Sequence, residues 1–143
     1  MPRGSRRLPE ECVRRLEAAD LILHAGDFVS AEVYSRLREL GPLEAVHGNM
    51  DDARLKRALP ARRIVEVGQA RIGLVHEPAR AAGFEHCEAI VYGHTHMPAV
   101  VREGETWLLN PGSPTERRRS PVHSMLLLTV DEKALTPELV ALS

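Results

Sequence analysis

The chain has 143 residues, 43% of them apolar, and its 20 acidic and 19 basic side chains leave a formal net charge of −1. This length suits one layered core, and the balanced charge argues against non-specific nucleic-acid binding as the main role, because such binding needs a large positive field. No segment approaches the ~18 apolar residues of a membrane span, and two cysteines are too few for a disulfide framework. We expect a single domain, residues 1–143, in the cytoplasm.

The first third of the chain alternates helix-forming and strand-forming segments. Residues 8–19 predict a helix, with a proline and two glutamates in the first turn and an apolar stripe on one face. The short, continuously apolar run within residues 20–27 is typical of a strand buried on both faces. Ser30 is the expected N-cap of a second helix, after which residues 42–52 repeat the pattern of an apolar run, a glycine and polar residues.

The remainder of the chain reads mainly as strands and hairpins. Residues 62–76 predict two strands that turn at Gly68, and residues 99–113 predict a second hairpin that turns near Gly104. Further strands are expected within residues 88–96, 123–132 and 138–142. Strand–helix alternation followed by hairpins indicates an α/β fold with a mixed sheet, or with two sheets and helices outside.

Several of the apolar runs end in side chains that are suited to metal binding. In chain order these side chains are Asp27, Asn49, His76, His94 and His96. Carboxylate, amide and imidazole groups together suit borderline ions such as Mn²⁺, iron or Zn²⁺. A single Gly-Asp or Gly-Asn pair usually marks a turn, and a single histidine at a strand end is usually structural. The ordered set is more specific, and its two histidines in "GHTH" can face one cleft because residues i and i+2 of an extended chain share a side.

This ordered set resembles the calcineurin-like metallophosphoesterase superfamily, in particular its small bacterial and archaeal phosphodiesterases. The resemblance runs from about residue 8 to the C-terminus and includes "NPGSPTERR", which begins at Asn110. It implies a two-sheet sandwich flanked by helices, with two metal ions at the strand ends. By motif, Asp27 bridges both ions, Asn49, His76 and His94 complete one site, and His96 serves the other.

The implied activity is hydrolysis of small phosphodiesters or phosphomonoesters by a metal-bound hydroxide. Two ions ~3.5–4 Å apart can share that hydroxide and stabilise charge on the phosphoryl oxygens. The implied cofactors are divalent transition metals (Mn, Fe, Zn or Ni). No membrane association or strong nucleic-acid binding is implied, and a homo-oligomer is compatible with the sequence.

The sequence departs from the family pattern at its N-terminus. The family's first strand ends in an Asp-x-His motif that supplies two ligands of the first metal site, whereas here the sequence begins with Met1 and a segment like the loop and helix that follow the motif. The first site is left with Asp27 and His96, while the second keeps four ligands. Either the working protein carries about ten more residues, which we favour, or the domain binds one metal or none. The rival function is a scaffold or binding module, a role that a retromer subunit of this superfamily has taken.

Three further residues bear on the predicted site. His24 is interpreted as a core or supporting histidine rather than a direct ligand. Glu77 follows His76 where the family continues with glycine and histidine, and we read it as solvated. Met50 stands where many superfamily phosphatases carry a histidine thought to protonate the leaving group, which favours substrates with good leaving groups.

Overall fold

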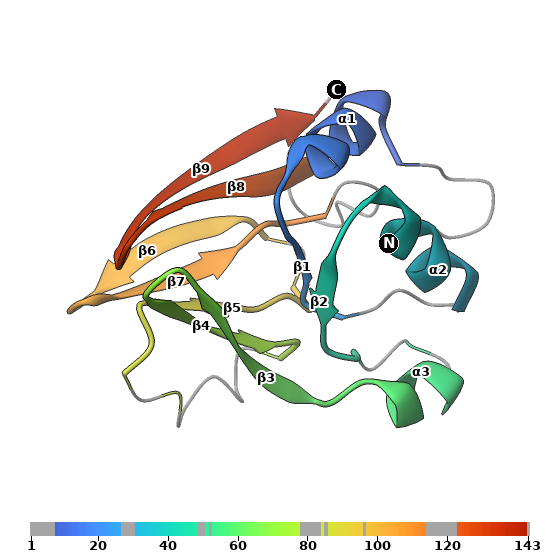
Figure 1. Cartoon of the computed structure of the whole chain (residues 1–143), viewed down its shortest axis with the longest axis horizontal. Coiled ribbons are helices and arrows are strands. Elements are labelled where there is room, and N and C mark those ends of the chain that lie inside the picture. The colour runs from blue at the N-terminus through green and yellow to red at the C-terminus, as the bar shows by residue number, and fades with distance from the viewer. Residues whose placement is uncertain are drawn as a thin grey trace.

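A computed structural model of the chain describes residues 8–26, 31–48, 51, 53–77, 84, 86–95, 97–113 and 123–142 (Figure 1). Its elements are α1 (Glu10–Ala18), β1 (Ile22–His24), α2 (Ala31–Leu40), β2 (Leu43–Ala45), α3 (Ala53–Ala58), β3 (Arg62–Val67), β4 (Ala70–Val75), β5 (Ala89–Val91), β6 (Ala99–Glu103), β7 (Thr106–Asn110), β8 (His123–Asp131) and β9 (Ala134–Leu142). Among these helices, none has the length and apolar character needed to cross a membrane.

The strands form one large sheet and two strand pairs. The large sheet has the order β3-β4-β5-β7-β6, while β1 pairs with β2 and β8 pairs with β9. The two predicted hairpins, β3-β4 and β6-β7, form the antiparallel edges of the large sheet, and their turns contain Gly68 and Gly104 at positive φ. The central pairs β4-β5 and β5-β7 are parallel, as is β1-β2. The segments that follow β4 and β5 therefore leave the sheet at the same end of its strands. The segments that follow β1 and β2 likewise leave their pair at a common end.

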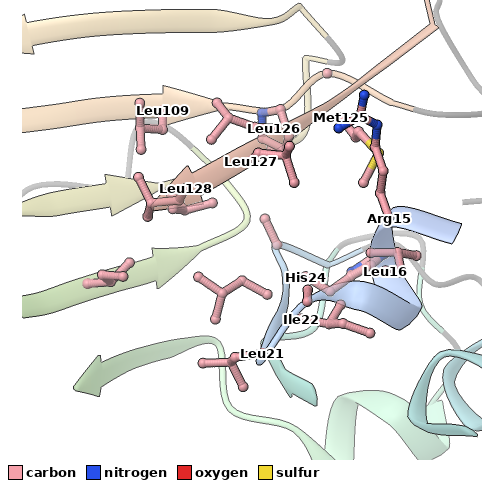
Figure 2. A pocket seen from close by; sticks show the side chains of 18 of the residues that line it. Arg15, Leu16, Leu21, Ile22, His24, Leu109, Met125, Leu126, Leu127 and Leu128 are labelled. Carbon is pink, nitrogen blue, oxygen red and sulfur yellow. The ribbon is translucent and has the colours of Figure 1, made fainter. Parts of the chain in front are cut away.

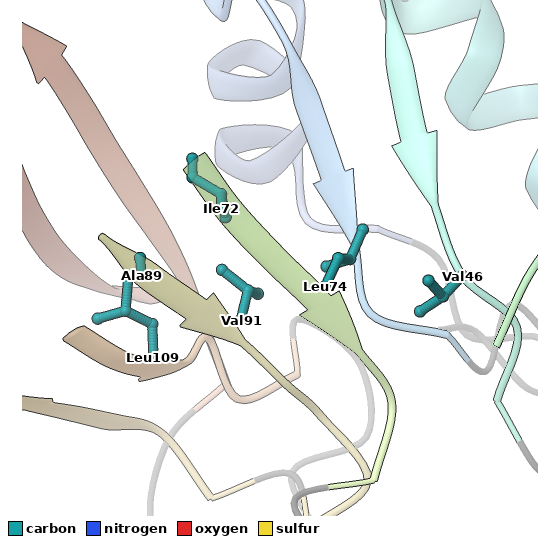
Figure 3. Close-up of a cluster of buried hydrophobic side chains, with 6 residues drawn as sticks. All are labelled: Val46, Ile72, Leu74, Ala89, Val91 and Leu109. Atoms are coloured by element: carbon teal, nitrogen blue, oxygen red, sulfur yellow. The ribbon is translucent and has the colours of Figure 1, made fainter. Parts of the chain in front are cut away.

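The layers are joined by separate apolar clusters. One cluster fills the space between the inner face of the five-stranded sheet and the two strand pairs (Figure 3); its buried members are Val46, Ile72, Leu74, Ala89, Val91 and Leu109. A second cluster packs α2 and α3 against β2, and a third packs α1 against β8 and β9. Phe84 and Cys87 pack with Val75 and Ile90 on the opposite face of the large sheet. This arrangement confirms the predicted α/β class and the two stacked layers of strands.

A cavity separates the two strand pairs. It has a volume of about 490 Å³ and lies between β1 and β8, with α1 on one side and the inner face of the five-stranded sheet on the other. Figure 2 shows Ile22 and His24 on one wall and Leu126 and Leu128 on the facing wall. No ladder joins β1 to β8 in the described part of the chain. The cavity therefore lies between two strand pairs that the described residues do not connect.

Three details differ from the sequence-based expectations. Strand β1 is not buried on both faces, because Leu23 and His24 are only partly buried beside the cavity. Helix α3 has no counterpart among the expected elements; it has only six residues and lacks an acidic first turn. Strand β9 begins at Ala134 rather than near residue 138. Its Pro137 is tolerated because β9 is an edge strand, where the missing N–H has no second neighbour to bond.

The thiol of Cys12 is expected to react slowly in the folded protein. Cys12 lies on the buried side of α1 at 2% exposure, and burial, with a smaller contribution from the charge of Glu11, raises the pKa of its thiol to about 11. Because the thiolate is the nucleophile, alkylation by iodoacetamide at pH 8 should be at least about tenfold slower than in the urea-unfolded chain. The measurement uses a Cys87→Ser variant, so that one thiol is followed, and equal rates in native and unfolded protein would contradict the expectation.

Candidate metal centre

The turns that follow β1 and β2 lie directly against each other. Gly26 has φ +101°, and a Cβ atom at this position would lie 2.6 Å from the backbone nitrogen of Gly48, closer than real Cβ atoms approach. The parallel pairing of β1 and β2 brings the two turns to the same end of the pair. Position 26 of the "GD" motif therefore requires glycine for two reasons: the close contact with Gly48 leaves no room for a Cβ atom, and the positive φ is unfavourable for other residues.

Side chains from the neighbouring residues hold both turns. The backbone N–H of Gly26 donates to Nδ1 of His24 at 3.0 Å, and that of Gly48 donates to Oδ2 of Asp51 at 2.7 Å. Asp51 is only 5% exposed, so this carboxylate serves the turn rather than the solvent. Asp51 was not among the predicted site residues, although an acidic side chain three residues after a turn glycine is suited to accept such a bond.

His76 is held in one orientation by the turn after β1. It is 5% exposed, and its Nδ1 lies 2.8 Å from the carbonyl oxygen of Ala25. A carbonyl oxygen can only accept, so Nδ1 carries the hydrogen and donates it. The lone pair of the neutral ring is therefore on Nε2, and a histidine braced in this way is typical of metal ligands.

His94 presents a ring nitrogen to this lone pair. Its Nδ1 lies 3.3 Å from Nε2 of His76, and the two rings are nearly perpendicular, with an interplanar angle of 83°. Two imidazole nitrogens that bind one tetrahedral Zn²⁺ at ~2.0–2.1 Å are themselves ~3.3–3.4 Å apart. Without metal, the same spacing allows His94 to donate a hydrogen bond to His76. The spacing of this pair thus fits two ligands of one metal ion.

The structure describes two of the five predicted ligands and brings them together. The other three, Asp27, Asn49 and His96, lie outside the described residues. The first two directly follow Gly26 and Gly48, the glycines of the two contacting turns. A Cβ atom at Gly93 would lie 3.4 Å from Cβ of Ala25 and 3.5 Å from Nδ1 of His76. Within the described ranges, no group of three or more acidic, histidine or cysteine side chains forms a metal cluster, so the described part of the centre is a histidine pair.

A layered α/β sandwich with a histidine pair at its strand ends, next to two glycine turns, has the architecture of a metal-dependent phosphoesterase. Residues 4–133 match the family model of the calcineurin-like phosphoesterase superfamily domain, and the chain belongs to this superfamily. A probable metallophosphoesterase of Methanothermobacter thermautotrophicus is 33% identical over 150 residues. That alignment covers 98% of this chain and 86% of the archaeal protein.

Solved structures share the fold. Vps29 from Entamoeba histolytica, crystallised with Zn²⁺, superposes with a TM-score of 0.76 at 23% identity, over 99% of this chain and 93% of that one. An archaeal phosphodiesterase superposes with a TM-score of 0.72 at 20% identity, over 91% of this chain and 90% of that one. At these identities the similarity establishes the fold, and the activity has to be argued from the site.

Proposed function

We propose that this protein hydrolyses phosphodiesters or phosphomonoesters with the help of bound divalent metal. Membership of the calcineurin-like phosphoesterase superfamily supports a phosphoesterase function. The observation that carries the metal dependence is the pair of His76 and His94, whose facing nitrogens have the separation of two ligands on one ion. The proposal covers small substrates, since nothing in the charge of the chain favours nucleic acid or membrane.

The proposed ligands divide between two positions. Asp27, Asn49, His76 and His94 would hold one ion, and His96, with Asp27 shared, would contribute to the second. Carboxylate, amide and imidazole donors suit Mn²⁺, Fe, Zn²⁺ or Ni²⁺. The Zn²⁺ in crystals of the Entamoeba histolytica Vps29 supports a transition metal on this fold.

The residues around the site would prepare it for the metal. When bound, the metal supplies Lewis-acid stabilisation of the phosphoryl oxygens and lowers the pKa of a water molecule that attacks phosphorus. Ala25 fixes the tautomer of His76 through its carbonyl oxygen, so that Nε2 offers its lone pair. Asn49, as a neutral ligand, would add no negative charge and keep the ion electrophilic.

A second candidate is a metal-binding module with little catalysis. The observation that favours it is the cavity between β1 and β8, across which the described residues form no strand pairing beside the histidine pair. His76 and His94 both contribute to the lining of this cavity. A site that is open on this side would bind metal through its own ligands and yet position a second ion or a substrate poorly.

The unsubstituted chain is expected to retain about one equivalent of transition metal, because only one of the two proposed positions has the ~3–4 protein ligands that a bound ion needs. Elemental analysis of protein purified without chelator measures this, with His76→Ala as the control that should lose the metal. Two full equivalents would show that other side chains complete the second position.

The catalytic proposal has a separate readout. The same protein should hydrolyse an activated aryl phosphodiester weakly, and the rate should fall to background with chelator and return with added Mn²⁺. Metal retention without chelator-sensitive hydrolysis would favour the binding module.

A further inference from the structure

The buried amide of Asn110 spans the turn that carries His94. Asn110 ends β7, the parallel neighbour of β5, and its side chain is inaccessible to solvent. Its Nδ2 donates to the carbonyl oxygen of Gly93 at 3.3 Å and to Oγ1 of Thr95 at 3.1 Å. Its Oδ1 accepts from the backbone N–H of Gly112 at 2.9 Å. Both N–H donors of the amide are thus used on the residues immediately before and after His94.

The turn that this amide spans is strained. Thr95 donates its backbone N–H to the carbonyl oxygen of Gly93 at 2.9 Å, and His94 between them has φ +70°. A three-residue turn of this kind with a left-handed central residue is rare and strained, more so for a histidine than for glycine. Such a conformation persists only where the surroundings over-determine it. Among the described hydrogen bonds, those of the Asn110 amide hold both sides of the turn.

We infer that Asn110 is a positioning residue for the metal centre. It keeps the strained turn closed, so that Nδ1 of His94 faces Nε2 of His76 at ligand spacing. The inference deepens the proposed function and rests on it where it concerns metal affinity. It also gives "NPGS" a physical role, since the Asn110 side chain reaches from this motif into "GHTH".

The test compares two buried side chains of the same region. Asn110→Asp keeps the shape of the side chain but replaces both N–H donors by an oxygen that repels the Gly93 carbonyl. Ser124→Ala is the matched control: Ser124 is equally inaccessible and donates to the carbonyl oxygen of Pro111 at 2.8 Å, away from the turn. The readouts are the nuclear Overhauser effect between the His76 and His94 rings in metal-free protein, and the dissociation constant for Zn²⁺ measured by calorimetry.

Asn110→Asp should abolish the Overhauser effect between the rings and weaken Zn²⁺ binding by about tenfold or more, as expected when a residue supporting a ligand is changed. Ser124→Ala should change neither. An unchanged Overhauser effect and Zn²⁺ affinity in folded Asn110→Asp, or an equal change in Ser124→Ala, would overturn the inference. If the Overhauser effect disappears in Asn110→Asp alone, while even the unsubstituted chain binds no Zn²⁺, the positioning role is sustained and the proposed function is defeated.

A milder pair of variants covers the case in which Asn110→Asp does not fold. Thr95→Val removes the hydroxyl that receives one Asn110 hydrogen bond, whereas Thr95→Ser keeps it. The valine variant should weaken Zn²⁺ binding several-fold, and the serine variant should match the unsubstituted chain. Equal affinities in the two variants would contradict the bracing of the turn by Asn110.

Discussion

His94→Ala is expected to abolish metal retention by this chain, whereas His96→Ala should leave it nearly unchanged. The two histidines are one residue apart, yet they are proposed to serve different ions. His94 faces His76 at ligand spacing, and the proposal assigns it to the position with four ligands. In the same proposal, His96 shares its position with Asp27 alone among the residues of this chain, so we expect that position to bind metal weakly. Loss of one preorganised imidazole from the fuller position forces the ion to accept water instead, at a large cost in affinity.

The same asymmetry should be visible in thermal stability. Metal that binds only the folded state stabilises it by ~3–4 kcal/mol when present at ~100–1,000 times its dissociation constant. The melting temperature of the unsubstituted chain and of His96→Ala should therefore rise with added Zn²⁺, and that of His94→Ala should not. The metal-free melting temperatures of the two variants serve as the control for folding. Equal loss of metal from both variants would refute the separate assignment and indicate that the two imidazoles bind one ion.

The sequence predicted the fold wherever a local pattern and the tertiary structure agree. Glycine turns at Gly68 and Gly104 between apolar runs are strong local signals, and both hairpins formed as expected. Helix α3 escaped prediction because six residues are too few to show a helical period. The extent of β9 escaped it because Pro137 reads as a strand breaker, and only the sheet topology shows that it lies on an edge strand.

The sequence indicated candidate ligands for the site but not the residues that support them. Glycine followed by a ligand at a strand end is visible in the sequence, and the structure brings the described members of this set, His76 and His94, together. Asp51 and Asn110 were missed as functional residues. Each acts through hydrogen bonds to the backbone of a turn, and Asn110 reaches a turn about 16 residues away that becomes a neighbour only through the parallel pairing of β5 and β7. The partners of Asn110 therefore follow from topology, whereas the bond of Asp51 spans only three residues and could have been expected from local spacing.

The cavity between β1 and β8 bears on how much of the activity this chain can show. Its walls are two strand edges, a helix and the inner face of a sheet, which is the environment of an interior strand. Leu126 and Leu128 line it from one side and Ile22 from the other, so apolar area faces the empty space (Figure 2). His76 and His94 contribute to the same lining, so side chains at one end of an added strand would lie close to the histidine pair.

If the proposed function holds, joining an N-terminal strand that ends in Asp-x-His to this chain should raise hydrolysis of an activated aryl phosphodiester by orders of magnitude. The strand would fill the cavity and pair with β1 and β8, while its aspartate and histidine would add the two ligands that the His96 position lacks. Two ions ~3.5–4 Å apart activate water and stabilise the phosphoryl oxygens together, which one ion does less well. The measurement is hydrolysis of an activated aryl phosphodiester with Mn²⁺, alongside the metal content of the extended protein.

The matched control is the same extension with its aspartate and histidine replaced by asparagine and alanine. This control should raise the melting temperature as the functional extension does, because it also fills the apolar cavity, but it should not restore a second metal equivalent. In the functional extension, the asymmetry between His94→Ala and His96→Ala should disappear, since both positions are then filled and both are needed. A well-folded extended protein that binds two equivalents and hydrolyses no faster would show that this fold serves as a binding module. A functional extension that leaves the melting temperature unchanged would show that the cavity between β1 and β8 does not receive the strand.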